Sequence, residues 1–164
     1  MTPAIVQARS TGIEFRIHEF SSREDGRSAQ RGNAAAAVAA LGLPLEHVFK
    51  TLIAKLDGAA LVVAVVPVSC QLDLKRLASA AGARRASMAG AKEAERATGY
   101  RPGAISPLGQ RQRLPVFIDE SAFACPSIYV SGGRHGIEIE LTAMALRDAC
   151  DGRAAGVAKP DSRD

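Results

Sequence analysis

Residues 98–110 read Thr98-Gly99-Tyr100-Arg101-Pro102-Gly103-Ala104-Ile105-Ser106-Pro107-Leu108-Gly109-Gln110 and lie between an alanine-rich segment and an apolar one. Two prolines and three glycines stand among these residues. Glycine lets the backbone approach a ligand closely, and proline fixes φ and removes an amide donor. The composition therefore predicts a shaped, semi-rigid loop. Such a loop is either an ordinary connection or one of the functional loops that rigid scaffolds present.

The segments that flank this loop predict regular structure on both sides. Residues 90–97 predict a short helix that leads into the loop, and residues 114–119 predict a strand that follows it. Further upstream, Asp73 is a good N-cap for a helix over residues 74–81, which Gly82 ends. The loop is therefore expected to connect a helix to a strand.

The N-terminal part alternates helix and strand patterns. Thr2 followed by Pro3 predicts a helix start with Thr2 as the N-cap. Residues 14–18 alternate polar and apolar side chains, as a half-buried strand does, and residues 33–41 form an alanine-rich helix pattern.

Lys50 is the unusual member of a strand predicted over residues 48–54. Side chains alternate across a strand, so Val48, Lys50 and Leu52 share one face. A lysine between apolar neighbours either extends its ammonium out to water or projects it into a pocket, and the residues alone leave both interpretations open. Residues 61–66 form a continuous apolar run, which predicts a strand covered on both faces.

The C-terminal part predicts a hairpin, a last helix and a tail. Residues 127–130 and 137–141 predict two strands, joined by the glycine-rich residues 131–136. Thr142 is a good cap for a last helix that reaches Cys150. Residues 151–164 are expected to form a frayed polar tail.

Six predicted strands with interspersed helices indicate one compact α/β domain over residues 1–150, with a mixed and strongly curved β-sheet. Aromatic residues make up only 4% of the chain and tryptophan is absent, which argues against aromatic platforms for stacking RNA bases. The net charge of +4 favours a polyanionic partner, but it also suits a basic protein with no nucleic-acid role.

The residues offer no conventional catalytic, metal or nucleotide site. Ser106 is not part of a G-x-S-x-G turn, and the usual phosphate-binding loops are missing. The odd number of cysteines (Cys70, Cys125 and Cys150) shows no C-x-x-C spacing, and the histidines show no metal-ligand spacing. No cofactor or metal is therefore expected. The sequence shows neither a signal peptide pattern nor an apolar run of ~18 residues, so a cytoplasmic protein with reduced thiols is expected.

What remains is the loop over residues 98–110, the lysine on an apolar strand face and the second glycine-rich loop. These features belong to a series of short runs that match one family pattern in the same order. The runs are Met1-Thr2-Pro3-Ala4, Val48-Phe49-Lys50-Thr51-Leu52, Val65-Val66-Pro67-Val68, Gln71-Leu72-Asp73-Leu74-Lys75, Thr98-Gly99-Tyr100, Ile105-Ser106-Pro107-Leu108-Gly109-Gln110, Arg113-Leu114-Pro115, Ile128-Tyr129-Val130-Ser131-Gly132-Gly133 and Ile139-Glu140-Leu141.

Over residues 1–150 the chain thus resembles the YbaK family, bacterial deacylases that remove cysteine wrongly attached to proline tRNA and are related to the editing domain of prolyl-tRNA synthetase. The resemblance implies a compact α/β domain around a curved, partly barrel-like mixed β-sheet with surrounding helices. It implies hydrolysis of the ester between an amino acid and the tRNA 3′ end, without metal or cofactor. In this subgroup the substrate's own thiol is thought to attack its carbonyl and to displace the tRNA as a cyclic thioester.

The family's functional positions can be placed on this sequence. The pocket lysine corresponds to Lys50, the Gly-x-Ile-Ser-Pro loop to residues 103–107 and the second glycine loop to residues 131–133. The resemblance gives catalytic roles to Lys50, Gly103 and Ser106. It gives substrate-binding roles to Phe20, Thr51, Tyr100, Ile105, Pro107, Ser131, Gly132, Gly133 and Glu138. The basic residues expected to contact tRNA phosphates are Arg84, Arg85, Arg111, Arg113 and Arg134.

Three positions depart from the family pattern. Phe20 stands where a tyrosine is expected, Ala104 replaces a glycine and Glu138 stands where an aspartate is common. Alternatives therefore stay open: a deacylase for another amino acid such as alanine, a small thioester or peptide hydrolase, or a non-catalytic module that binds tRNA or a synthetase. Prolyl-tRNA synthetase is a further candidate partner.

Overall fold

The computed structural model describes residues 1–21 and 32–161. The α-helices in this part of the chain are α1 (Pro3–Ser10), α3 (Gly32–Leu41), α4 (Leu74–Ala81), α5 (Ala91–Thr98) and α6 (Ala143–Cys150), and two short 3₁₀ helices are η1 (Leu45–His47) and η2 (Glu120–Ala124). The strands are β1 (Arg16–Glu19), β2 (Phe49–Leu56), β3 (Ala60–Pro67), β4 (Cys70–Leu72), β5 (Ala86–Met88), β6 (Val116–Asp119), β7 (Ile128–Ser131), β8 (Ile137–Leu141), β9 (Arg153–Ala155) and β10 (Ala158–Pro160).

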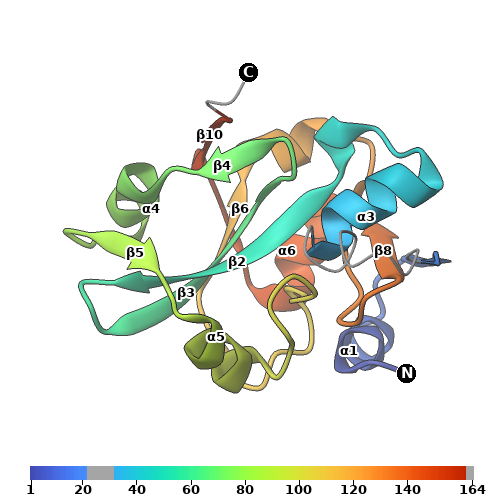
Figure 1. Ribbon diagram of the computed structural model, residues 1–164, viewed down its shortest axis with the longest axis horizontal. Coiled ribbons are helices and arrows are strands. Elements are labelled where there is room, and N and C mark those ends of the chain that lie inside the picture. The colour runs from blue at the N-terminus through green and yellow to red at the C-terminus, as the bar shows by residue number, and fades with distance from the viewer. Residues whose placement is uncertain (22–31, 162–164) are drawn as a thin grey trace.

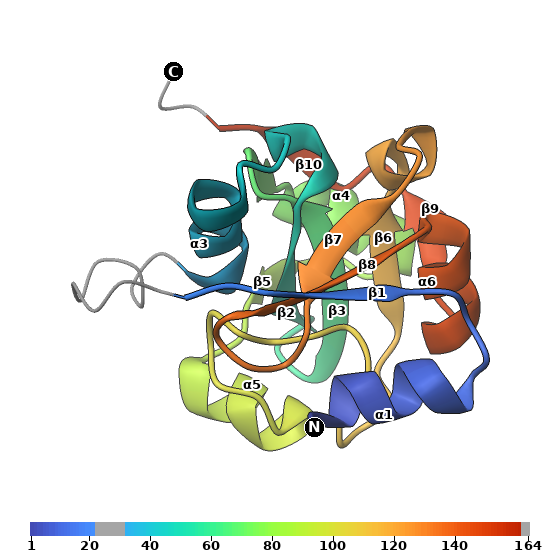
Figure 2. The ribbon, with the colours of Figure 1, turned by 90° about the vertical axis from the view of Figure 1, so that its right-hand side faces the viewer.

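The strands form three sheets rather than a closed barrel. The largest has the order β5-β2-β3-β6-β9, in which β5, β2 and β3 are antiparallel and β6 and β9 are parallel to β3. The antiparallel sheet β1-β8-β7 crosses it, and a bridge between Val48 and Tyr129 connects the two (Figures 1 and 2). The predicted α/β fold with a mixed sheet is confirmed, whereas the strands of the described residues do not close into a barrel.

Local sequence signals explain where the helices begin and end. The Thr2 hydroxyl accepts a hydrogen bond from the Ile5 amide at the start of α1, and the Asp73 carboxylate accepts from the amides that open α4. Gly82 ends α4 with a φ of +72°, a conformation that costs glycine little. These predicted caps are confirmed.

β3 separates two apolar clusters because its side chains alternate across the sheet. Val63 and Val65 pack into the cluster that also contains Phe49, Leu108 and Ile139. The alternate β3 residues, Val62, Ala64 and Val66, pack on the other face. Their partners there include Leu72, Leu77 and Val157. The prediction of a strand covered on both faces is confirmed.

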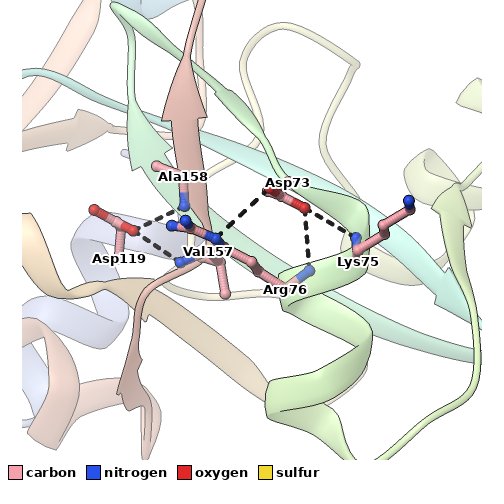
Figure 3. A network of polar contacts seen from close by, with 6 residues as sticks. All are labelled: Asp73, Lys75, Arg76, Asp119, Val157 and Ala158. Atoms are coloured by element: carbon pink, nitrogen blue, oxygen red, sulfur yellow. Dashed lines mark hydrogen bonds and ion pairs between the residues drawn. The ribbon is translucent and has the colours of Figure 1, made fainter.

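The expected polar tail after Cys150 is wrong for residues 153–160. Arg153–Ala155 pairs with β6, and Ala158–Pro160 pairs with β4. Between them Val157 is fully buried, and its carbonyl accepts from the Asp73 amide at 2.7 Å. The Asp119 carboxylate accepts from the amides of Val157 and Ala158 at 3.0 and 2.9 Å (Figure 3). The small apolar residues of this segment and its two hydrogen bonds to the Asp119 carboxylate thus hold it on the fold. Residues 162–164 of the expected tail lie outside the described residues.

None of the described helices has both the length and the apolar character needed to cross a membrane.

Candidate active site

A pocket of about 200 Å³ lies where the start of α3, the first half of β2, the loop after α5 and the end of β7 meet. These elements come from distant parts of the sequence, and Figure 1 shows α3 beside β2 and the loop below them. The pocket is lined by Gly32, Asn33, Ala34, Phe49, Lys50, Thr51, Leu52, Val68, Gly103, Ile105 and Ser131.

Five of the residues given a site role by the sequence meet in this pocket. Lys50 and Thr51 come from β2, Gly103 and Ile105 from the loop, and Ser131 from β7. The lysine on the apolar strand face and the first glycine-bearing loop therefore both line one pocket.

Lys50 is half-buried and is one of the residues that line the pocket. Burial lowers the pKa of Lys50 below its usual value, because a charged ammonium is less well solvated there. The negative charges of Asp161 and Cys70 oppose this shift. Lys50 is therefore a half-buried residue of the pocket lining rather than a fully exposed strand residue.

The two hydroxyl groups of the pocket differ in their hydrogen bonds. Ser131 Oγ donates to the Ala104 carbonyl at 3.0 Å and accepts from the Gly133 amide at 3.1 Å. Thr51 Oγ1 is buried and has no hydrogen-bond partner among the described residues. Ser131 therefore joins the two loops, whereas the Thr51 hydroxyl makes no such contact among the described residues.

Gly103 is at the rim of the pocket and has a φ of +88°, which favours glycine. Its carbonyl accepts from the Asn33 amide at 2.7 Å. Within the described part of the chain, the amides of Gly103 and Ile105 have no acceptor. The amides of the second glycine loop are occupied, since Gly132 donates to the Ile137 carbonyl and Gly133 to Ser131.

Three residues of the loop over residues 98–110 lie behind the pocket wall instead of lining it. Ser106 is fully buried, and its hydroxyl accepts from the Leu108 amide at 3.2 Å. Tyr100 is 4% exposed and donates its hydroxyl proton to the Leu108 carbonyl at 2.7 Å. Burial raises the pKa of the Tyr100 hydroxyl, so it stays neutral. Pro107 is buried and lines a separate hollow beside α1.

Glu138 and Phe20 also lie outside the pocket lining. Glu138 is fully buried, and Oε2 of its carboxyl group accepts from Nδ2 of Asn33. Burial raises the pKa of Glu138 to about 8, against the lowering effect of that hydrogen bond. Phe20 packs edge-to-face on His135, with 6.1 Å between the ring centroids, and donates its amide to the Gly136 carbonyl.

All five arginines that were expected to contact tRNA are exposed. Arg84 and Arg85 line a hollow with Lys55 at the far end of β2 from Lys50. Arg113 lies 3.9 Å from the Asp151 carboxylate, beside α6. The remaining two are in the loop after α5 and in the hairpin between β7 and β8: Arg111 and Arg134.

The sequence missed Asn33, the polar residue that lines the pocket from α3. Its only signal is an asparagine at the start of an alanine-rich helix, where an N-cap is the ordinary interpretation.

In the part of the chain that the structure describes, no three His, Cys, Asp or Glu side chains gather closely enough to hold a metal ion. Burial raises the pKa of Cys150 to about 12, and its thiol donates to the Leu146 carbonyl.

Comparison with known proteins adds the family. A family model described as the aminoacyl-tRNA editing domain matches residues 29–149. A protein of Enterococcus faecalis named "Putative Cys-tRNA(Pro)/Cys-tRNA(Cys) deacylase EbsC" is 33% identical over 156 residues, which cover 95% of this chain and 92% of that protein.

Two solved structures share the fold over nearly their whole length. A hypothetical protein superposes with a TM-score of 0.83 at 22% identity, covering 96% of this chain and 100% of that one. A structure described as "a putative trans-editing enzyme for prolyl tRNA synthetase" gives a TM-score of 0.76 at 20% identity, covering 97% and 99% of the two chains. The pattern of short runs, the family model and the Enterococcus relative agree: the chain belongs to the aminoacyl-tRNA editing domain family.

Proposed function

We propose that this protein is a trans-acting aminoacyl-tRNA deacylase that hydrolyses mischarged tRNA, with Cys-tRNA(Pro) as its substrate. The observation that carries the proposal is the position of Lys50, which shares a small pocket with Gly103 and Ile105. The name of the Enterococcus relative supports cysteine as the amino acid.

The dimensions of the pocket suit a small aminoacyl group. Its volume of about 200 Å³ is below the ~300–1,000 Å³ of pockets that enclose drug-sized ligands. A nucleotide does not fit inside, so the terminal adenosine of the tRNA stays at the rim while the amino acid enters. A pocket that only measures size separates substrates that differ by one methylene by roughly 1–3 kcal/mol.

A reactive thiol in the substrate provides the further selectivity. Sulfur attacks the carbonyl carbon of its own aminoacyl ester, and the bond from that carbon to the ribose oxygen breaks. The proton of the thiol passes to the ribose oxygen, so tRNA leaves with a free hydroxyl group. Water then opens the cyclic thioester to free cysteine. Alanine and proline esters lack the thiol and do not react by this route.

The protein's part in this reaction is placement. Orientation of the reacting groups can contribute ~7–11 kcal/mol. The Lys50 ammonium and the Thr51 hydroxyl orient the ester, and the amides of Gly103 and Ile105 are donors for the developing oxyanion. Each such donor contributes on the order of 2.7–4 kcal/mol.

The tRNA body binds outside the pocket. The exposed arginines contact phosphates, which position the tRNA without reading its bases. Proline tRNA and prolyl-tRNA synthetase are the partners, and the cytoplasm is the location.

A single-turnover assay with cysteine-charged proline tRNA tests the proposal. Wild-type protein is expected to release cysteine, and Lys50→Ala to lose most of the activity while it stays folded. Lys75→Ala is the control, because Lys75 is an exposed lysine of α4 that lines neither the pocket nor the hollow beside Arg84 and Arg85. Full activity of Lys50→Ala, or equal losses in the two variants, contradicts the role of Lys50.

The amino acid on the tRNA tests the chemistry. Proline tRNA charged with serine, alanine or S-methylcysteine is expected to stay intact, since none of these carries a free thiol. Hydrolysis of the S-methylcysteine ester contradicts thiol assistance, and selective loss of alanine identifies a different editing specificity. Binding of tRNA with no hydrolysis of any ester identifies a non-catalytic module.

A further inference from the structure

Asn33 connects three walls of the pocket and is 1% exposed. Its backbone amide donates to the Gly103 carbonyl at 2.7 Å. Its side-chain Nδ2 donates to the Ile137 carbonyl at 2.8 Å and to Oε2 of Glu138. Its Oδ1 accepts from the Gly136 amide at 2.8 Å. One residue of α3 thereby binds the first glycine loop and the hairpin between β7 and β8.

These contacts determine the orientation of the Asn33 amide. A carbonyl oxygen accepts and an NH₂ group donates. Rotation of the amide by half a turn would place Nδ2 against the Gly136 amide and Oδ1 against the Ile137 carbonyl, so both contacts would be lost. The donor to Glu138 is therefore fixed by the backbone of the hairpin.

The backbones of Gly32 and Gly103 also approach each other closely. A β-carbon on Gly32 would lie 3.5 Å from the Gly103 carbonyl oxygen, and one on Gly103 would lie 3.4 Å from Gly32 Cα. The first turn of α3 and the loop therefore touch through their backbones. The position of the Gly103 peptide depends on where Asn33 holds that turn.

Asn33 is also the group that orients the Glu138 carboxyl. Oε1 of Glu138 has no hydrogen-bond partner among the described residues, and Oε2 has Asn33. The residues opposite Glu138 on the neighbouring strands have other partners. Nε2 of His18 on β1 contacts Glu140 at 2.9 Å, and Ser131 on β7 donates to Ala104.

We propose that Asn33 is a positioning residue of this active site, which is held by the Glu138 carboxyl group outside the pocket lining and itself holds the Gly103 peptide in the position that binds the aminoacyl ester. The rate measurements that test this role rest on the proposed function, whereas a titration of the Glu138 carboxyl group does not. A failure of the proposed deacylase function can therefore be told apart from a failure of the role given to Asn33.

A swap of donor and acceptor is the sharpest test. Asn33→Asp keeps the acceptor for the Gly136 amide, but it removes the donor to the Ile137 carbonyl and to Glu138 and brings two carboxyl groups together. We expect kcat for cysteine-charged tRNA to fall by about 100-fold, as for a misplacement of roughly 1 Å. Adding Glu138→Gln supplies a side-chain amide that can donate to the new carboxylate at position 33. The kcat of the double variant is therefore expected to be about tenfold higher than that of Asn33→Asp alone, as for directly coupled residues.

Thr142→Ala is the matched control for a purely structural effect. Thr142 caps α6 by accepting from the Ala145 amide at 3.0 Å and does not line the pocket. Loss of such a cap costs about 1 kcal/mol of stability, so this variant is expected to be less stable with unchanged kcat. Unchanged kcat in Asn33→Asp, or a double variant no better than Asn33→Asp alone, overturns the proposal.

Carbon-13 NMR titration of the Glu138 carboxyl provides the readout that needs no substrate. The Asn33 hydrogen bond lowers the pKa of Glu138, so Asn33→Ala is expected to raise it further. If the wild type hydrolyses no aminoacyl-tRNA, the proposed function fails and this titration alone decides the role of Asn33. An unchanged Glu138 pKa in Asn33→Ala then overturns the inference.

Discussion

Thr51 keeps a buried hydroxyl group without a hydrogen-bond partner among the described residues, although such a group typically costs ~1–3 kcal/mol. Thr51→Val replaces the hydroxyl by a methyl group of similar size. The variant is therefore expected to be as stable as the wild type or more stable in urea unfolding. If the hydroxyl contacts the aminoacyl ester, the same variant loses deacylase activity. Thr51→Val with full activity would show that the hydroxyl does not contact the substrate.

Thr98→Val is the control for that substitution. The Thr98 hydroxyl donates to the Ala94 carbonyl at 2.8 Å and accepts from the Tyr100 amide at 3.1 Å. Its removal leaves buried backbone groups unpaired, which is expected to cost ~1–3 kcal/mol. The two threonine variants should therefore move stability in different directions.

Glu138 makes the stability of the fold depend on pH. Burial raises its pKa to about 8 from an ordinary value of 4.5, so the folded protein holds a proton that the unfolded chain has released. The stability that the neutral group contributes is complete below pH 4.5 and is lost as the pH rises toward 8. Relative to Glu138→Gln, the wild-type free energy of unfolding is expected to fall by up to about 1.4 kcal/mol per pH unit in this window. Parallel stability curves for the two proteins would contradict the raised pKa.

Helix α1 is the element that holds the first glycine loop from behind. The Thr2 hydroxyl donates to the Gly132 carbonyl at 2.6 Å, and Oε1 of Gln7 accepts from the Gly109 amide. A β-carbon on Gly109 would lie 2.4 Å from the Pro3 carbonyl carbon. Both glycine loops therefore rest on the first helix of the chain.

Gly109→Ala and Gly12→Ala separate this contact from backbone strain. Their φ values are +69° and +71°, but nothing lies within 4 Å of a β-carbon on Gly12. The left-handed conformation costs a non-glycine residue roughly 1–2 kcal/mol, which is the loss expected for Gly12→Ala. Gly109→Ala must also displace α1, so we expect a clearly larger fall in thermal midpoint together with reduced deacylase activity. Equal falls in thermal midpoint in the two variants would show that α1 can move away from the added β-carbon at little cost in stability.

The elements that the sequence predicted are those with strong local signals. Caps at Thr2, Asp73 and Thr142 and the apolar run of β3 depend on neighbours in the chain, and the structure confirms them. The short strands β4, β5, β9 and β10 have no such signal, because each is held by a partner far away in sequence. β10 pairs with β4 across more than eighty residues of chain, and no local pattern predicts such a contact.

The candidate site was predictable to a similar extent. Lys50 and Gly103 stood out because a lysine on an apolar strand face and a glycine with constrained neighbours are unusual locally. The contact of Asn33 with Glu138 depends on α3 packing against β8, so neither residue alone reveals it. Tyr100 and Ser106 have the composition of binding residues, but the structure uses their hydroxyls to hold the loop.

At the scale of the whole molecule, the pocket and an exposed pair of arginines lie at opposite ends of β2. Lys50 and Lys55 are five residues apart on β2, which is about 17 Å at ~3.3 Å per residue. Arg84 and Arg85 stand beside Lys55. We propose, as part of the deacylase function, a path along β2 that brings acceptor-stem phosphates to this pair of arginines when the 3′ end enters the pocket at Lys50.

Salt dependence tests that path. Each phosphate that a protein neutralises contributes roughly −0.9 on a duplex to the slope of log affinity against log salt. The Arg84→Ala/Arg85→Ala double variant is therefore expected to bind proline tRNA with a slope smaller by about 2, and to discriminate between tRNAs as the wild type does. Arg147→Ala is the control, because the Arg147 guanidinium packs 5.8 Å from the centroid of the Phe123 ring and contacts Asp148. A wild-type slope in the double variant would place the acceptor stem elsewhere, and a reduced slope in Arg147→Ala would mean that the path extends over α6.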